Sequence, residues 1–345
     1  MRSVGSTSKI NRPKIRTGSR LIPKGAKPSR RSSKELLRRP IRDYDSFNYS
    51  EPSMLINRMI NSGGFEAVNL ANGVEILKSM YGDRNCVKFL SFVGAIISTG
   101  TRGIIRELIK EHAFDCVITT CGALDHDIAR TSANYYAGDF RLDDSSLLKV
   151  GIHRLGNVLI PFENYGNVIE KKVRACLEEL YFNRNKKHIA PSEILDFIGS
   201  KLNDSSFLYW ANKNRIPVIV PGIVDGAVGS QLWLFHQQHR DFSIDLLRDQ
   251  DTISDIVYDA ERTGAFMIGG GISKHHTLWW NQFKGGLDYA VYLTTSPEWD
   301  GSLSGALVEE AVSWGKITSK ASRVTIHGEA TTLIPFIYAA LHDRS

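Results

Sequence analysis

The chain has 345 residues, of which 42% are hydrophobic and 23% charged. This composition is ordinary for a globular protein of one or two domains, and no apolar run approaches the roughly 20 residues that span a bilayer. Because an apolar signal segment is also lacking at the start, we expect a cytoplasmic protein without a membrane anchor. The four cysteines show no metal-ligand spacing, so we expect no metal and buried free thiols at Cys86, Cys116, Cys121 and Cys176.

The formal net charge of +6 is unevenly distributed along the chain. Residues 1–42 hold fourteen Lys and Arg and one acid, Glu35, whereas the rest of the chain holds 29 basic and 36 acidic residues. Because residues 1–42 are also poor in apolar side chains, they are predicted to form a flexible basic arm. Four interpretations of the arm remain open: a solvated tail, a transit peptide, a non-specific RNA-binding segment, or a segment that folds on a partner subunit.

Residues 43–345 are predicted to form a single, mildly acidic domain in which strands and helices alternate. An acidic surface suits cationic substrates and argues against a nucleic-acid-binding core. The alternation predicts a mostly parallel sheet with helices on both faces, which is a doubly wound α/β fold. In chain order, helices are expected at 51–63, 65–80, 101–112, 162–182, 192–202, 244–263, 306–314 and 333–341, strands at 87–93, 114–120, 216–220, 265–268, 289–295 and 323–326, and an irregular flap at 134–157.

Glycine-rich turns follow four of the expected strands, after Val93, Thr120, Val220 and Ile268. The carboxyl ends of parallel strands share one edge of a sheet, so these turns and the loop at Ser296 should converge there. Glycine-rich turns that lead into helices suit the close approach of a phosphate-bearing ligand. The G-x-G-x-x-G fingerprint is absent, but this edge is the predicted site, and a nucleotide fits it better than a metal.

Two polar clusters follow expected strands. Asp125, His126 and Asp127 come after the strand at 114–120, where helix caps are favoured over ligands. His275 and His276 open the helix that follows a triple glycine. Adjacent residues do not share a helical face, so these two histidines are poor candidates for a metal site.

The segment 296–316 carries the strongest chemical signal. A strand ends, a loop follows, and the helix expected at 306–314 delivers Trp314 and Lys316. A lone lysine at a helix end is usually a cation favoured by the helix dipole. Here Glu309, Glu310 and Ser313 lie within the same eight residues, which favours a lysine that attacks a carbonyl or imine carbon.

From Val87 to its end, the chain resembles deoxyhypusine synthases, and most closely the archaeal branch. Six motifs in order carry the resemblance: I-S-T-G-T-R (97–102), T-T-C-G (119–122), V-D-G-A-V-G-S (224–230), G-G-G-I-S-K-H-H (269–276), W-D-G-S-L-S-G (299–305) and E-A-V-S-W-G-K (310–316). The resemblance implies a homotetramer of Rossmann-like subunits with active sites at a dimer interface. It implies oxidation of spermidine with NAD, an aminobutyl imine on a lysine, and transfer to a lysine of the translation initiation factor 5A precursor.

The family's site residues carry over by motif. The resemblance implies Lys316 as the covalent nucleophile, with Trp314, Glu310 and His276 around the amine. It implies further amine contacts at Gly301 and Ser302. Around NAD it implies Gly94, Ala95, Ile96, Ile97, Ser98, Thr120, Cys121, Gly122, Asp225, Gly271, Thr295, Ser296, Glu329 and Ala330.

Three positions depart from the eukaryotic pattern by removing carboxylates expected to hold the ammonium ends of spermidine. They are His126, Ser230 and Leu303. Asp125 or Glu309 would then supply the charge, and in a straight helix Glu309, rather than Glu310, shares a face with Lys316. Agmatine as donor, a homospermidine synthase-like transferase, a paralogue that only binds partners, and an RNA-associated role for the arm remain as alternatives.

Overall fold

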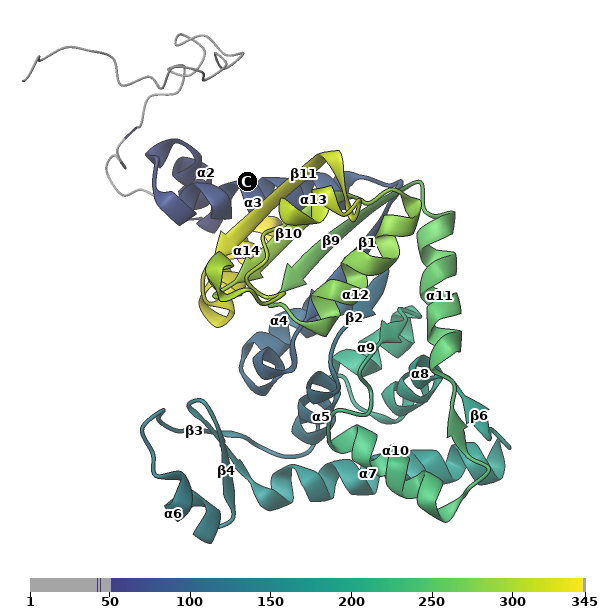
Figure 1. Cartoon of the computed structure of the whole chain (residues 1–345). Helices are drawn as coiled ribbons and strands as arrows, with labels where there is room; N and C mark the ends of the chain where they lie inside the picture. Colours follow the sequence, from purple (N-terminus) through teal and green to yellow (C-terminus); the bar gives the residue numbers. More distant parts are fainter. Residues whose placement is uncertain (1–41, 43, 45–50, 344–345) are drawn as a thin grey trace, which may run out of the picture. The chain divides into compact units, whose positions relative to one another are not determined.

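The structure is a computed structural model, and it describes Arg42, Tyr44 and residues 51–343 (Figure 1). The basic arm expected at 1–42 lies outside the described residues, apart from Arg42. The described residues belong to one compact unit. None of the described helices combines the length and the apolar content that crossing a membrane requires.

Six parallel strands form the central sheet, which confirms the predicted α/β fold. Their spatial order is β11-β10-β9-β1-β2-β7. The strands are rich in β-branched and aromatic residues, as expected for a parallel sheet that is buried on both faces. Their bounds are β1 (Cys86–Phe92), β2 (Cys116–Ile118), β7 (Val218–Ile219), β9 (Arg262–Ile268), β10 (Leu287–Thr294) and β11 (Ile317–His327).

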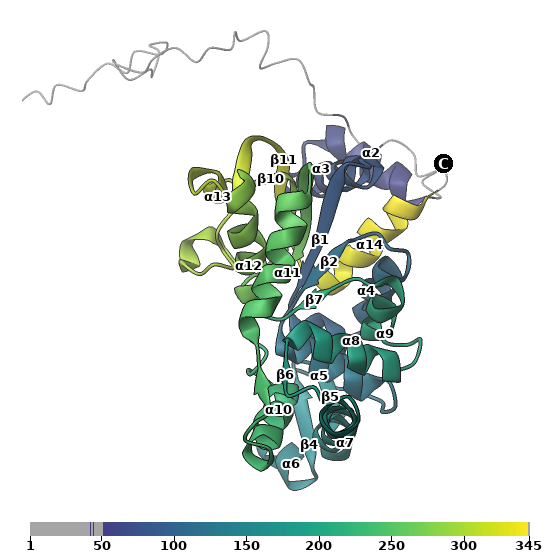
Figure 2. The same cartoon turned by 90° about the vertical axis from the view of Figure 1, so that its right-hand side faces the viewer.

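Helices cover both faces of this sheet (Figure 2). Successive strand residues point to opposite faces, so Leu90 of β1 joins one hydrophobic core and Phe89 joins the other. The Leu90 face is covered by α3 (Phe65–Gly82), α4 (Thr101–Lys110) and α14 (Ala330–His342). The Phe89 face is covered by α11 (Leu246–Asp259), α12 (Ile272–Asn281) and α13 (Glu310–Ser313).

The remaining elements include several that the sequence analysis did not predict. Helix α9 was missed because it has only eight residues, which is too short for a clear apolar period. Strands β6 and β8 were missed because each has two residues. These elements are α2 (Pro52–Ser62), α5 (Cys121–Arg130), α7 (Gly166–Glu178), α8 (Pro191–Lys201), α9 (Phe207–Asn214), α10 (Ala227–Gln238), β6 (His188–Ile189), β8 (Ser243–Ile244) and the short helices η1 (Gly94–Ser98), η2 (Phe162–Asn164), η3 (Glu179–Asn183), η4 (Gln282–Lys284) and η5 (Glu298–Asp300).

The prediction of an irregular flap at 134–157 is wrong. This stretch contributes to a three-stranded antiparallel sheet in the order β3-β5-β4, with a helix between β3 and β4. The guanidinium of Arg154 fixes that helix by donating two hydrogen bonds of 2.6 Å to Asp144. Strands of two to four residues leave no periodic signal in a polar sequence. The elements are β3 (Tyr136–Ala137), α6 (Asp144–Lys149), β4 (Ile152–Leu155) and β5 (Val158–Pro161).

Three predicted boundaries also change. The helix expected at 244–263 ends at Asp259, and β9 begins at Arg262. The helix expected at 306–314 is reduced to α13, because the amides of Gly305 and Ala306 both turn back to the carbonyl of Ser302. The strand expected at 323–326 starts much earlier, at Ile317, directly after the lysine singled out by the sequence.

Candidate functional site

The carboxyl ends of the strands carry the residues that the resemblance links to the cofactor. All six strands are parallel, so the turns after them lie at one edge of the sheet. Figure 1 shows this edge at the arrowheads of β9, β10 and β11. The structure thus brings together η1 after β1, Thr120–Gly122 after β2, Asp225 after β7, Gly271 after β9, Thr295 and Ser296 after β10, and Glu329 and Ala330 after β11.

Two of these turns touch through their glycines. A Cβ on Gly94 would lie 2.8 Å from the backbone of both Gly122 and Ala123, so only glycine permits this approach. Beside the contact, Thr119 Oγ1 donates a hydrogen bond of 2.8 Å to the carbonyl of Phe92. The two turns are therefore held together at the edge, where they present a backbone surface that a ligand can approach closely.

A cavity of about 520 Å³ opens at the same edge. One wall is fixed by Arg130 of α5, whose Nη1 donates to the carbonyls of Ile97 at 2.7 Å and Thr99 at 2.6 Å. The cavity is lined by Ser98, which belongs to a predicted cofactor segment, and by Thr331, which directly follows another. The volume lies within the range of sites for small organic ligands.

Lys316 lies at the opposite edge of the sheet, which the sequence analysis did not anticipate. Its carbonyl accepts a hydrogen bond of 3.1 Å from the amide of Leu287, the first residue of β10. Strand β10 has eight residues, so the two edges are roughly 20–25 Å apart. After Ser296 the chain runs back across the Phe89 face through α13, and it carries Lys316 away from the glycine-rich turns.

The ammonium of Lys316 lies against two indole rings. Its Nζ is 5.3 Å from the ring centroid of Trp314 and 5.5 Å from that of Trp279 on α12. Helix α13 ends at Ser313, and Gly315 has a φ of 69°, so Lys316 is not part of the helix. The shared helical face that would have paired Glu309 with Lys316 therefore does not form.

Trp279 is a site residue that the sequence analysis missed. The available signal was its spacing of four residues from His275, which places both rings on one face of α12. The two ring centroids are 5.6 Å apart. Partial burial and the charge of Lys316 lower the pKa of His275, which shows that this histidine faces the same region.

His276, the next residue on α12, has its ring 6.4 Å from that of Trp280. Its Nε2 has no hydrogen-bond partner among the residues that the structure describes. Burial, with a smaller effect of neighbouring His275, lowers the pKa of His276 to about 4. The imidazole is therefore neutral near pH 7, and it can exchange one hydrogen bond with a bound amine.

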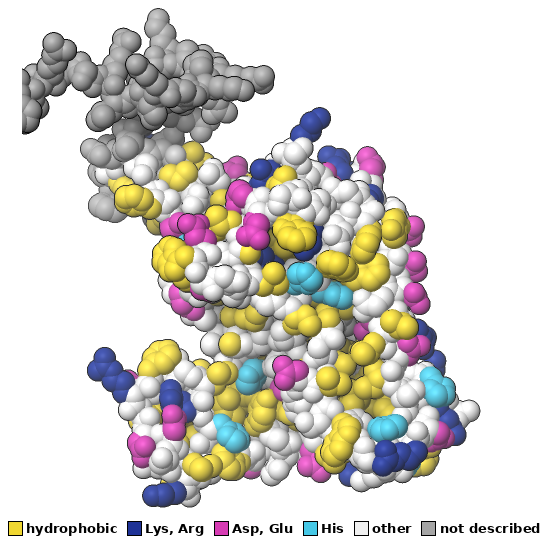
Figure 3. All heavy atoms as spheres, in the orientation of Figure 1, with side chains coloured by type: hydrophobic (Ala, Val, Ile, Leu, Met, Phe, Trp, Pro, Cys, Tyr) yellow, Lys and Arg dark blue, Asp and Glu magenta, His cyan; other side chains and the backbone are white. Residues whose placement is uncertain are grey.

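The surroundings of Lys316 are open in the single chain. Trp314 is 66% exposed, and Glu310 also faces solvent. Figure 3 shows hydrophobic side chains gathered over α12 and α13, with histidines beside them. Exposed aromatic residues around a half-buried lysine are typical of a surface that another molecule covers.

Asp125 and Asp127 are helix caps, as the sequence favoured, but they cap helices other than their own. They lie inside α5, which begins at Cys121. Asp125 accepts from the amides of Ala227 at 2.9 Å and Val228 at 2.8 Å, at the start of α10. Asp127 accepts from Ser206 Oγ, from the amides of Phe207 and Leu208 at the start of α9, and from Arg102 Nε.

The positions that depart from the eukaryotic pattern carry no charge. His126 is buried, its Nδ1 lies 3.0 Å from Tyr135 Oη, and burial lowers its pKa to about 4. Ser230 Oγ donates to the carbonyl of Gly226 at 3.0 Å. Leu303 is 40% exposed in the loop that follows η5 and that also contains Gly301 and Ser302.

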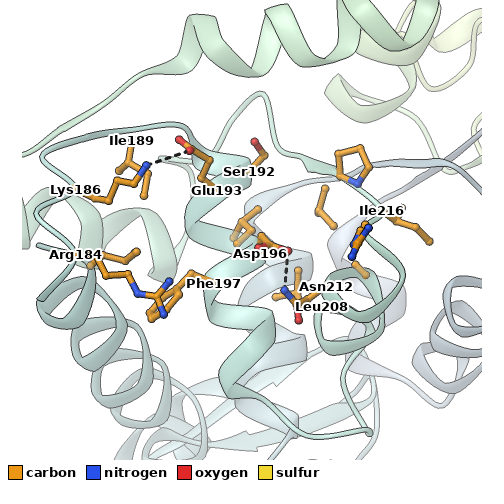
Figure 4. Close-up of a pocket in the computed structure, with 16 residues that line it drawn as sticks. Arg184, Lys186, Ile189, Ser192, Glu193, Asp196, Phe197, Leu208, Asn212 and Ile216 are labelled. Carbon is orange, nitrogen blue, oxygen red and sulfur yellow. Dashed lines mark hydrogen bonds and ion pairs between the residues drawn. The ribbon is translucent and has the colours of Figure 1, made fainter.

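A second cavity, of about 470 Å³, lies between η3, α8 and α9 (Figure 4). Within it, Lys186 pairs with Glu193 at 3.8 Å and Asn212 donates to Asp196 at 2.8 Å. It contains no residue predicted for the site. Among residues 42, 44 and 51–343, no three His, Cys, Asp or Glu side chains lie close enough to hold a metal ion, and all four cysteines are buried free thiols.

The sheet and the helices on both of its faces define a doubly wound α/β protein. Residues 54–341 match the model of the deoxyhypusine synthase family. The chain belongs to this family.

Relatives agree with this placement. The chain is 53% identical over 306 residues to a "Probable deoxyhypusine synthase" of Picrophilus torridus, across 88% of this chain and 97% of that one. It is 44% identical over 314 residues to a protein of the same description from Ignicoccus hospitalis, across 89% and 97% of the two chains. The crystal structure of a "putative deoxyhypusine synthase" from Entamoeba histolytica shares the fold, with a TM-score of 0.59 and 20% identity over 87% of this chain and 96% of that one.

Proposed function

We propose that this protein transfers the aminobutyl group of spermidine to a lysine of the translation initiation factor 5A precursor, with NAD as cofactor and Lys316 as covalent carrier. The observation that carries the proposal is the position of the Lys316 ammonium between the indoles of Trp279 and Trp314. Indole faces attract cations, and they also shield an imine from water. Membership of the deoxyhypusine synthase family supports the same activity.

The carboxyl edge fits a dinucleotide. The Gly94–Gly122 contact leaves a backbone surface without side chains, and the cavity beside Ser98 and Thr331 offers room for one nucleoside. When bound there, NAD supplies the hydride acceptor that oxidation of an amine needs, since no side chain can take a hydride. η1, the Thr120–Gly122 turn and the Glu329–Ala330 pair would hold it.

This chain's residues then have distinct roles. The amine of Lys316 attacks the imine carbon of the oxidised substrate, and a diamine leaves. The lysine of the protein acceptor attacks the resulting enzyme imine, which releases Lys316 and leaves an imine on the acceptor. Return of the hydride that bound NAD would have taken from spermidine would reduce this imine to the secondary amine. Glu310 attracts the ammonium groups, and the neutral imidazole of His276 holds one amine nitrogen through its buried Nε2.

We further propose that two copies of the chain complete each site within a homotetramer. The cofactor edge and Lys316 lie at opposite ends of β10, roughly 20–25 Å apart, which a lysine side chain cannot span. The exposed indoles around Lys316 would be covered by the carboxyl edge of a neighbouring copy. An isologous dimer forms two such sites at once.

A second candidate uses a different amine. His126, Ser230 and Leu303 leave the predicted amine pocket without three carboxylates, and both Asp125 oxygens already accept hydrogen bonds. Agmatine as donor, or a small amine as acceptor, would need fewer ammonium-binding groups than spermidine does.

Mass spectrometry of the factor 5A precursor separates these activities. The precursor is incubated with the enzyme, NAD and either spermidine or agmatine, and a parallel reaction replaces the protein acceptor with putrescine. A mass increase of about 71 Da, which an aminobutyl group adds, supports the proposal if it requires spermidine and NAD. Modification with agmatine only, or of putrescine only, would favour the second candidate, and no modification with any amine would reject both.

A further inference from the structure

Lys274 is a buried lysine outside the predicted catalytic set. It lies in the first turn of α12, and only 1% of its surface is exposed. Its Nζ donates to the carbonyl of Leu303 at 3.0 Å and to that of Ala306 at 2.5 Å. No carboxylate of the described residues lies within ion-pair distance, and the ammonium instead lies 3.7 Å from the ring centroid of Tyr292.

The loop that Lys274 binds is also held by strand β10. Tyr292 Oη donates to the carbonyl of Ser304 at 2.6 Å, and Thr294 Oγ1 donates to the same oxygen at 3.0 Å. The backbone at Gly270 packs so closely on Ser304 that a Cβ there would lie 2.3 Å from its Oγ. Three side-chain donors, one from α12 and two from β10, thus fix the carbonyls of Leu303, Ser304 and Ala306.

This loop connects the two halves of the proposed site. It begins after Ser296 at the cofactor edge, contains the predicted amine contacts at 301–303, and leads through α13 to Lys316. Because α12 also carries Trp279, Lys274 ties the loop to the helix that supplies one of the two indoles beside Lys316. A displacement of the loop would therefore move the amine contacts and the approach to Lys316 together.

The burial of a lysine with no carboxylate of the described residues within ion-pair distance argues for a specific role. Moving an ammonium out of water is costly, whereas an apolar side chain of similar length would fill the same space without that cost. What an apolar side chain cannot provide is the pair of donors to two carbonyls of one loop.

We propose that Lys274 is a positioning residue, which holds the loop 301–306 so that its amine contacts face the substrate and the following segment presents Lys316. The role rests on the aminoalkyl transfer proposed above. The cofactor segments after β1, β2 and β7 lie on other loops, so they should not depend on Lys274.

The first experiment measures the loop itself and does not require activity. Hydrogen exchange of the full chain is compared with that of Lys274→Met, which keeps the length but removes the donors. Amides of residues 302–307 should exchange about tenfold faster or more in the variant, while those of β1 and β9 stay unchanged. Equal exchange in the loop would overturn the proposal, whether or not the protein turns out to transfer an aminobutyl group.

The second experiment measures function. In Lys274→Met, the KM for the amine should rise about tenfold or more and borohydride trapping at Lys316 should fall, while NAD binding stays within about twofold. A purely structural role would instead reduce NAD binding and thermal stability together with amine use. If the wild type is active and Lys274→Met has the same amine KM and the same trapping at Lys316, the positioning role is rejected and the proposed function is unaffected.

Two further variants guard against misfolding and nonspecific effects. Tyr292→Phe removes one donor to the loop without altering a buried charge, and it should raise the amine KM about twofold to fivefold. Lys320→Met, at an exposed position of β11, should match the wild type in both experiments. If Lys274→Met does not fold, an unchanged exchange rate and KM in Tyr292→Phe would count against the proposal.

Discussion

The carboxyl edge of the sheet and the α12–α13 face differ in how complete they are within one chain. At the edge, glycine turns touch and Arg130 holds η1 through two carbonyls. On the α12–α13 face, Trp314 is 66% exposed, and the ammonium of Lys316 lies against the indole rings of Trp279 and Trp314. Folding of a single chain is therefore enough to pack the carboxyl edge. We expect the α12–α13 face to exclude water only when another molecule covers it.

The largest effect is expected at Lys316. Lys316→Arg keeps the positive charge but cannot form an imine, so aminobutyl transfer should fall by about a thousandfold or more. NAD binding should persist, because the cofactor edge is at the other end of β10. The measurement is borohydride trapping with labelled amine, followed by peptide mapping. Lys320→Arg is the matched control, and a label on a lysine other than Lys316 would remove the central claim.

Co-expression of two inactive variants tests whether the cofactor edge of one copy of the chain meets Lys316 of another copy. Gly122→Val fills the cofactor edge without a close clash in its own chain, since a Cβ there meets only Gly94 Cα at 3.9 Å. Co-expressed with Lys316→Arg, it should restore about a quarter of wild-type activity, because half of the randomly formed dimers carry one intact site. Activity no higher than that of each variant alone would show that both regions of a site come from the same chain.

The indoles should matter less than the lysine. Trp279→Ala should lower kcat/KM for the amine about tenfold to thirtyfold, because it removes one of two faces that hold a cation. Trp233→Ala on α10 is a suitable control, since Trp233 is 59% exposed and does not contact Lys316. Steady-state kinetics with the amine varied gives the comparison, and equal losses in the two variants would contradict a role for Trp279.

The close packing of the turns at the carboxyl edge predicts that a substitution there lowers the free energy of unfolding. Gly94→Ala places a Cβ 2.8 Å from backbone atoms that cannot move freely, so unfolding should become easier by about 1–3 kcal/mol. Gly100→Ala is the control, because a Cβ at Gly100 meets nothing within 4 Å. Thermal unfolding of both variants measures the difference, and a Gly94→Ala protein as stable as the control would show that the two turns do not pack as described.

The smallest effect concerns acid stability. Burial lowers the pKa of His126 to about 4, so between about pH 6.5 and pH 4 the unfolded chain binds a proton that the folded chain does not. This contribution to stability is therefore complete above pH 6.5 and is lost as the pH falls toward 4. His126→Gln should flatten that part of the pH–stability curve by about 1–3 kcal/mol in urea titrations. Stability curves of the wild type and the variant that remain parallel at every pH would contradict this prediction.

The local sequence pattern predicts the turns after the strands, but it does not predict which residues the side chains near those turns contact. The glycine-rich turns after β1, β2 and β9 could be predicted because alternation of strands and helices requires parallel strands, which share a carboxyl edge. Asp125 and Asp127 could be predicted as caps from their residue type. Asp125 caps the helix that begins about 100 residues later at Ala227, and Asp127 caps the helix that begins about 80 residues later at Phe207. No local pattern connects residues so distant in the chain.

The sequence by itself determined the sheet and the family, because both depend on residue order within short segments, and it singled out Lys316 as the candidate nucleophile. Only the tertiary structure decided where Lys316 lies. Gly315 and the turn at Ser302 shorten the expected helix, so the chain recrosses the sheet face before it enters β11. The tertiary structure also brought Trp279 to Lys316 and Lys274 to the 303–306 loop. Contacts between separate elements depend on how helices pack on the sheet, and packing is a property of the whole folded chain.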